Sequence, residues 1–204
     1  MTTTQIKPLS LESFLQQSYI DESPAWEYID GEIRQKPMPQ GQHSKLQYKL
    51  CETINQITEP ATIAYALPEL RCTFGGRSIV PDISVFLWDR IPLTPEEEIA
   101  NQFDSFPDWT IEILSPNQKP TKVIDNILHC LEFGCQLGWL IDPDERSIFV
   151  FKPNQALKNY KIDSADKLPI LESIDLNLTV SQIFSWLKQR ALKDPLKVIS
   201  PSQP

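Results

Sequence analysis

The stretch Trp109-Thr-Ile-Glu-Ile-Leu-Ser-Pro116 holds one acidic residue, Glu112, among aromatic, apolar and β-branched residues. Such a composition predicts a buried β-strand, and Pro116 ends it because a proline cannot donate a hydrogen bond to a neighbouring strand. Burying an ionised carboxylate is costly unless it has a charged partner or binds a metal ion. Glu112 is therefore a candidate functional residue.

A second acidic residue, Asp82, lies early in a similar apolar stretch, Val80-Pro-Asp-Ile-Ser-Val-Phe86. We expect residues 79–87 to form the outgoing strand of a hairpin, which begins with a strand at 70–74 and turns at Gly75-Gly76. In both acidic strands the apolar neighbours alternate, so the two carboxylates can share one face. The sequence thus offers a pair of strand carboxylates.

If these two strands are neighbours, Asp82 and Glu112 converge at a distance that one divalent cation bridges, with the backbone carbonyl of Ile113 as a further oxygen ligand. Mg²⁺ typically takes one or two carboxylates and keeps several waters, so such a pair is sufficient. The alternative is that each carboxylate caps a turn or pairs with an arginine or lysine. Spacing along the chain leaves both interpretations open.

Amphipathic helices are predicted to surround these strands. At 42–58 the apolar residues recur every three or four positions, and the same pattern at 122–133 is followed by Gly134, a residue type that often ends helices. The stretch 88–108, with its acidic run Glu96-Glu97-Glu98, is expected to be an irregular surface excursion. Further elements are expected as a short helix at 10–17, a hairpin around Asp30-Gly31, strands at 62–66, 137–141 and 147–151, and a helix at 180–187. This order predicts a single mixed α/β layer fold.

The composition is that of an acidic protein. Of 204 residues, 27 are Asp or Glu and 19 are Lys or Arg, and the resulting net charge of −8 disfavours a strongly basic nucleic-acid or membrane binder. The chain has no apolar run of about 18 residues and no secretory signal, so we expect a cytoplasmic protein that does not enter a membrane. We expect one domain over residues 1–190 and a polar, proline-containing tail over 191–204.

Several classes of site are disfavoured by the residues present. There are two histidines and four cysteines, and no two cysteines have C-x-x-C spacing, so any metal is expected to be a hard, oxygen-liganded Mg²⁺ or Mn²⁺. The motifs G-x-x-x-x-G-K-[ST], G-x-G-x-x-G and G-x-S-x-G do not occur. Their absence disfavours nucleotide-dependent and α/β-hydrolase chemistry.

Four segments, taken in order, resemble the signature segments of the Uma2 family. They are Glu27–Glu32, Val80–Val85, Glu112–Pro116 and Gly138–Pro143, and the resemblance extends over residues 10–187. The family is abundant in cyanobacteria and is regarded as a branch of the PD-(D/E)xK restriction-endonuclease-like superfamily. The resemblance implies a mixed central β-sheet flanked by helices and a metal-dependent endonuclease that hydrolyses DNA.

The resemblance also implies a site. Asp82 supplies the first metal carboxylate and Glu112 the second, while the lysine that the superfamily carries two residues after the glutamate is Leu114 in this chain. Uma2-like proteins carry that lysine on the following helix, where the expected position falls on Asn126. Lys122, one helical turn earlier on the same face, is predicted to act in its place, because an ammonium can orient the attacking water and offset transition-state charge. The alternative is that Lys122 is a solvated surface charge.

Three polar residues are candidates for accessory roles. Glu69 precedes the hairpin that leads to Asp82, His43 begins the first long helix, and Asn126 can donate a hydrogen bond where a lysine is missing. Glu27 belongs to a family segment, but its hairpin setting fits cross-strand pairing equally well.

Three functions remain open at this point. The first is a Mg²⁺-dependent or Mn²⁺-dependent endonuclease acting on DNA, impaired if Asn126 cannot replace the lysine, and a homodimer would suit the cutting of two strands. The second is an inactive nuclease fold that serves as a binding or assembly module, in which protein groups pair with Asp82 and Glu112. The third is a hydrolase of a small phosphoester, which would need a closed pocket.

Overall fold

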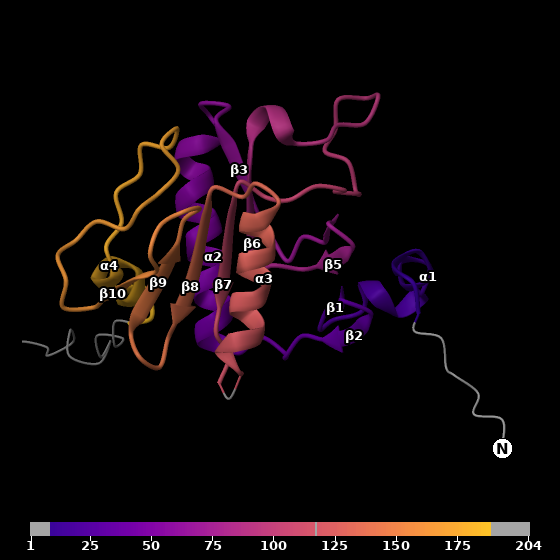
Figure 1. The fold of residues 1–204 in the computed structure, drawn as a ribbon. Coiled ribbons are helices and arrows are strands. Elements are labelled where there is room, and N and C mark those ends of the chain that lie inside the picture. The colour runs from indigo at the N-terminus through magenta and orange to yellow at the C-terminus, as the bar shows by residue number, and fades with distance from the viewer. Residues whose placement is uncertain (1–8, 117, 189–204) are drawn as a thin grey trace, which may run out of the picture.

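The computed structural model describes residues 9–116 and 118–188, which form two β-sheets with helices around them (Figure 1). The smaller sheet has the strand order β2-β1-β5-β4, and the larger has the order β10-β9-β8-β7-β6-β3. The strands are β1 (Trp26–Ile29), β2 (Glu32–Gln35), β3 (Ala64–Pro68), β4 (Cys72–Phe74), β5 (Arg77–Ile79), β6 (Ile83–Leu87), β7 (Trp109–Ile113), β8 (Leu137–Asp142), β9 (Ser147–Phe151) and β10 (Lys158–Lys161). The helices are α1 (Leu11–Leu15), α2 (Gly41–Thr58), α3 (Pro120–Glu132) and α4 (Val180–Ser185), with short 3-10 turns η1 (Ser18–Asp21) and η2 (Trp88–Arg90). The expected mixed sheet flanked by helices is therefore confirmed.

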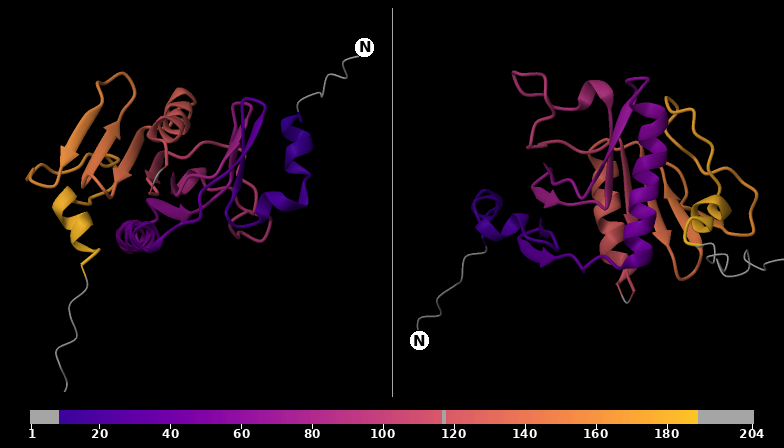
Figure 2. Two further views of the ribbon diagram at one scale, coloured as in Figure 1. Left: turned by 90° about the horizontal axis from the view of Figure 1, so that it is seen from below. Right: turned by 180° about the vertical axis from the view of Figure 1, so that it is seen from behind.

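The larger sheet is the core of the molecule, and helices cover both of its faces. Helices α2 and α4 lie on one face and α3 on the other (Figure 2, left). The strands β7 and β8 run parallel, whereas the other neighbouring pairs of this sheet are antiparallel. Because β7 has neighbours on both sides and helices above and below, all of its residues are buried. Its apolar sequence is thus explained by its central place.

The stretch predicted to be one strand at 79–87 is two strands in different sheets, so that prediction was wrong. β5 ends at Ile79 in the smaller sheet, and β6 begins at Ile83 in the larger one. The connecting residues Val80, Pro81 and Asp82 include a proline, which has no amide hydrogen for a strand ladder and so favours a break there. Asp82 consequently lies at the crossing between the two sheets.

Other expected elements are present with small shifts in their ends. The hairpin between β1 and β2 turns at Asp30 and Gly31, whose φ angles of 52° and 84° are the positive values that the Asp-Gly pair favours. Helix α2 begins at Gly41, α3 begins at Pro120, and Gly134 follows α3 with a φ of 118°. The predicted strand at 62–66 begins two residues later, as β3.

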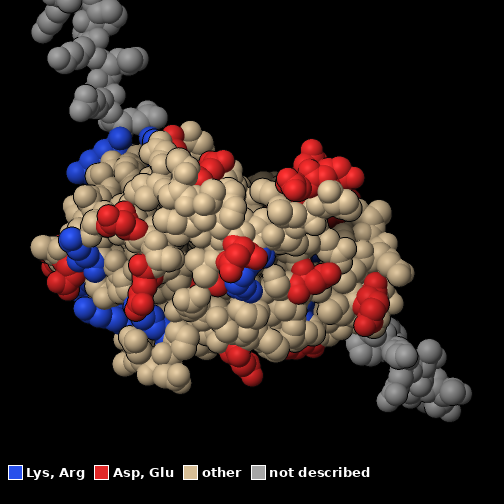
Figure 3. Space-filling model, turned by 90° about the horizontal axis from the view of Figure 1, so that it is seen from above, with Lys and Arg blue, Asp and Glu red and all other residues tan. Residues whose placement is uncertain are grey.

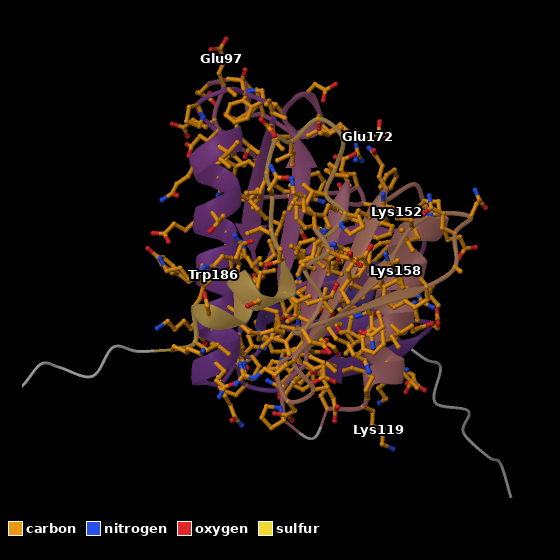
Figure 4. The ribbon with its side chains drawn as sticks, turned by 90° about the vertical axis from the view of Figure 1, so that its left-hand side faces the viewer. Glu97, Lys119, Lys152, Lys158, Glu172 and Trp186 are labelled. Carbon is orange, nitrogen blue, oxygen red and sulfur yellow. The ribbon has the colours of Figure 1, made fainter. Side chains whose placement is uncertain are left out.

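On the face that Figure 3 shows from above, acidic side chains are spread over the surface in separate groups, and basic side chains lie mainly toward one side. Glu97, in the irregular excursion, lies at the opposite end of the molecule from Lys119 (Figure 4). The excursion is not wholly on the surface, because Phe103 within it is 2% exposed and packs in a buried cluster. None of the helices in the described part of the chain is long and apolar enough to cross a bilayer. The predicted tail over 191–204 lies outside the described residues.

Candidate active site

Asp82, which directly precedes β6, lies opposite Glu112 of β7. β6 pairs antiparallel with β7 so that Ile83 faces Ile111, and continuing this register by one residue brings Asp82 to Glu112. Both side chains are buried, with 3% and 4% exposure. Asp82 Oδ2 accepts a hydrogen bond of 2.7 Å from the backbone N–H of Ile113. The expected convergence of the two carboxylates is therefore present.

Lys36, immediately after β2, carries the positive charge at this pair. Its Nζ donates to Asp82 Oδ1 at 2.7 Å and to the backbone carbonyl of Val80 at 2.6 Å, and it lies 3.6 Å from Glu112 Oε2. Lys36 was not predicted from the sequence, because no periodic pattern distinguishes a lysine that follows a hairpin strand from a surface charge. The one available signal was its position just after the family segment Glu27–Glu32.

Glu27 adds a third buried carboxyl to the group. Its side chain is 6% exposed, and Oε1 accepts a 2.9 Å hydrogen bond from the N–H of Val80. Asn126, from α3, reaches the same carboxyl with its Nδ2 at 3.4 and 3.5 Å from the two oxygens. Glu27 thus bridges the smaller sheet to α3, although its neighbour in register on β2 is Arg34. Asn126 hydrogen-bonds to Glu27, and among the described residues it makes no hydrogen bond to Asp82 or Glu112.

Helix α2 supplies two side chains to the same place. His43 and Gln47 are one helical turn apart and therefore face Asp82 together. His43 Nε2 lies 3.4 Å from Asp82 Oδ1, while its Nδ1 lies 3.4 Å from Ser115 Oγ. Gln47 Nε2 donates to the backbone carbonyl of Asp82 at 2.8 Å. His43 thus lies where an accessory residue was expected.

The charges of the group follow from burial and proximity. Burial alone would raise the pKa of Asp82, but Lys36 and His43 outweigh burial and hold this pKa well below its usual range. Burial raises the pKa of Glu112, and the nearby charge of Asp82 raises it further despite Lys36. Burial likewise raises the pKa of Glu27. The carboxyls in turn outweigh the burial of Lys36 and raise its pKa, so the lysine stays charged beside an ionised Asp82, while burial favours the neutral forms of Glu112 and Glu27.

The remaining expected residues lie at the rim. Lys122 is exposed and lines an open cavity of about 410 Å³ that Lys36 also lines. The other charged residues of this cavity are Arg34 and Lys119. Glu69 is exposed, and its backbone N–H donates to the Asp82 carbonyl at 3.1 Å. Lys122 and Glu69 are therefore neighbours of the buried group and not members of it.

The residues suit a hard divalent cation, although they do not form a finished cage. Asp82, Glu112 and the carbonyl of Val80 offer oxygen atoms, which Mg²⁺ and Mn²⁺ prefer, and Asn126 Oδ1 is a buried acceptor without a hydrogen-bond partner in the described residues. Within 9–116 and 118–188, no three His, Cys, Asp or Glu side chains form a ready-made metal site. Two carboxylates with waters satisfy Mg²⁺, so the donor set fits.

Comparisons with known proteins agree with this fold. Residues 11–183 match the model of the Uma2 family, described as "Putative restriction endonuclease". The structure is similar to a crystal structure of a "putative nuclease belonging to DUF820" from Anabaena variabilis ATCC 29413, with 50% identity and a TM-score of 0.85 over 89% of this chain and 100% of that one. The comparison with curated proteins gave no match. The family model spans most of the chain, and the protein therefore belongs to the Uma2 family.

Proposed function

We propose that the protein is an endonuclease that hydrolyses phosphodiester bonds of DNA with Mg²⁺ or Mn²⁺. The observation that carries this proposal is the opposed, buried pair Asp82 and Glu112 beside an open cavity rich in cations. An open cavity suits a polymer, whereas a small phosphoester would favour an enclosed pocket. Family membership supports a nuclease-type activity.

In this proposal, Asp82 and Glu112 would hold the metal ion, and the carbonyl of Ile113 would be a further ligand. When bound, the ion would polarise a phosphate oxygen and make a water molecule a better nucleophile. Lys122, on the cavity rim, would offset charge on the phosphate, since Asn126 carries none. His43, in contact with Asp82, would orient this carboxylate. Glu69, which is exposed and donates its backbone N–H to the carbonyl of Asp82, would have an accessory role beside the two carboxylates.

A second candidate function has an observation in its favour. Lys36 already pairs with Asp82 and lies near Glu112, as expected for an inactive module whose carboxylates are held by protein groups. Such a module would bind DNA or assemble without cutting.

We also propose a cytoplasmic location for the protein. We further propose a homodimer, which would place two sites on the two strands of a duplex.

The test is a plasmid-nicking assay with Mn²⁺ that compares the wild type with Asp82→Asn. The matched control is Asp163→Asn, at an exposed position far along the chain. We expect nicking by the wild type and the control and a loss of at least about 100-fold in Asp82→Asn, because a neutral amide lacks the negative charge of the carboxylates through which Mg²⁺ is usually bound. Absence of nicking by the wild type with Mg²⁺ or Mn²⁺ would favour the inactive module.

A further inference from the structure

The Lys36 ammonium has the surroundings of a bound cation. Its Nζ is enclosed by three oxygen atoms, at 2.7 Å from Asp82 Oδ1, 2.6 Å from the Val80 carbonyl and 3.6 Å from Glu112 Oε2. Two of these oxygens belong to the carboxylates proposed to hold the metal ion. A hard divalent ion selects the same kind of partner, namely oxygen atoms with negative charge.

The ammonium occupies the space between the two carboxyls. Asp82 Oδ2 accepts a hydrogen bond from the N–H of Ile113, whereas Lys36 Nζ contacts Asp82 Oδ1 directly and lies 3.6 Å from Glu112 Oε2, so a cation held by both carboxyls would meet the ammonium. Two positive charges within a few ångströms of each other repel strongly in a buried site, where solvent screens little. Binding of the metal ion therefore requires Lys36 Nζ to leave.

The side chain of Lys36 has somewhere to go. It is 14% exposed and lines the open cavity of about 410 Å³ together with Arg34, Lys119 and Lys122. Its backbone is held in place, because the N–H of Lys36 donates to the carbonyl of Ala25 at 2.9 Å. Movement is therefore confined to the flexible four-carbon stem of the side chain.

We propose that Lys36 and a divalent cation compete for one set of oxygen atoms, and that the displaced ammonium turns into the cation-rich cavity. There it would face the phosphate of the substrate, a part of the inference that rests on the proposed function. Lys36 would thus add, from the segment after β2, a second positive charge to that of Lys122 in the same cavity. The competition itself is independent of DNA and can be measured without it.

The first experiment titrates Mn²⁺ against the wild type and Lys36→Met by isothermal calorimetry. If Lys36 occupies the oxygens for most of the time, the apparent affinity of the wild type is reduced by the fraction of molecules in which they are free. We expect Lys36→Met to bind Mn²⁺ at least about 10-fold more tightly than the wild type. The control Lys158→Met, at an exposed position of β10, is expected to match the wild type. Lys36→Arg keeps the positive charge but changes the shape of the side chain. A Mn²⁺ affinity of Lys36→Arg between those of the wild type and Lys36→Met would separate displacement of the side chain from simple removal of its charge.

The second measurement uses the wild type and so does not depend on the variant folding. The ammonium of a lysine in a short ion pair gives a nitrogen signal in NMR spectra, and we expect Mg²⁺ to shift the Lys36 signal and speed its proton exchange. Equal Mn²⁺ affinity in Lys36→Met and wild type, or a Lys36 signal unmoved at saturating Mg²⁺, would overturn the competition and leave the nuclease proposal standing. A displaced Lys36 in a protein that never nicks DNA would uphold the competition and overturn the nuclease. No metal binding by either protein would overturn both.

Discussion

At the scale of single residues, the site is defined by unequal protonation of similar groups. Asp82 and Glu112 are both acids and both buried, yet the pKa of Asp82 is lowered by Lys36 and His43, whereas burial raises the pKa of Glu112. Lys36 can neutralise one carboxylate, and it contacts Asp82 more closely, at 2.7 against 3.6 Å. Burial therefore favours the neutral form of Glu112 without metal, whereas a divalent ion would favour its ionised form and would have to displace the ammonium.

The raised pKa of Glu112 makes stability depend on pH in the metal-free protein. As pH rises through the usual value for glutamate, about 4.3, the unfolded chain releases this proton while the folded protein retains it, so the folded state loses stability relative to a variant without the acid. We expect the free energy of unfolding of Glu112→Gln, minus that of the wild type, to increase between about pH 4 and pH 7 in EDTA, by up to about 1.4 kcal/mol per pH unit. Urea unfolding at a series of pH values measures this difference.

The control for this experiment is Glu172→Gln, at an exposed position. The free energy of unfolding of Glu172→Gln, minus that of the wild type, is expected to stay constant over the same pH range. A flat difference for Glu112→Gln as well would mean that Glu112 is ionised in the folded protein.

At the scale of elements, the site depends on how α3 is seated on the larger sheet. Gly138 of β8 lies directly beneath Ile127 of α3, and a Cβ atom on Gly138 would overlap the Ile127 Cγ2. Ile127 is fully buried and adjoins Asn126, which contacts Glu27. A side chain at position 138 must therefore push α3 away from the sheet and disturb the interaction between Asn126 and Glu27.

We accordingly expect Gly138→Ala to destabilise the protein by about 1–3 kcal/mol, the usual cost of overpacking a core. Urea unfolding measures the change. Ala66→Gly supplies a comparison at another buried strand position, where the loss of a methyl group is expected to leave the seating of α3 intact. Unchanged stability in Gly138→Ala would show that the helix moves freely over the sheet.

The elements could largely be predicted from the sequence, except for the break within residues 79–87. Helices α2 and α3 and strand β7 follow from apolar periodicity, and the antiparallel neighbours β6 and β7 bring Asp82 to Glu112 as expected. The division of residues 79–87 between two sheets could not be predicted from hydrophobicity, because both sides of Pro81 are apolar. Lys36 was missed for the same kind of reason, since it reaches Asp82 only through the packing of one sheet against the other.

At the scale of the whole molecule, the distribution of charge matters more than its sum. The net charge is −8, yet Arg34, Lys36, Lys119 and Lys122 line one cavity. Glu97 of the acidic run lies at the other end of the molecule from Lys119 (Figure 4). An acidic protein can therefore present a positive surface where DNA would approach.

This arrangement predicts the salt dependence of DNA binding. In an Asp82→Asn background, which prevents cleavage, we expect Lys119→Gln with Lys122→Gln to weaken duplex binding and to reduce the slope of log K against log salt by about 0.9 for each phosphate that the lysines no longer neutralise. The control pair is Lys158→Gln with Lys161→Gln, both in β10 at an edge of the larger sheet. Fluorescence anisotropy over a range of KCl measures the slope, and an equal reduction by both pairs would contradict a local binding surface.

We propose that Asp82 and Glu112 hold a divalent ion at the oxygens that Lys36 contacts in the absence of metal. The most direct measurement is anomalous X-ray diffraction from crystals of the wild type grown with Mn²⁺. The account predicts a strong anomalous peak between the two carboxylates, with the Lys36 side chain turned into the cavity beside Lys119 and Lys122. Crystals saturated with Mn²⁺ that show no peak there, with Lys36 still bonded to Asp82, would contradict it.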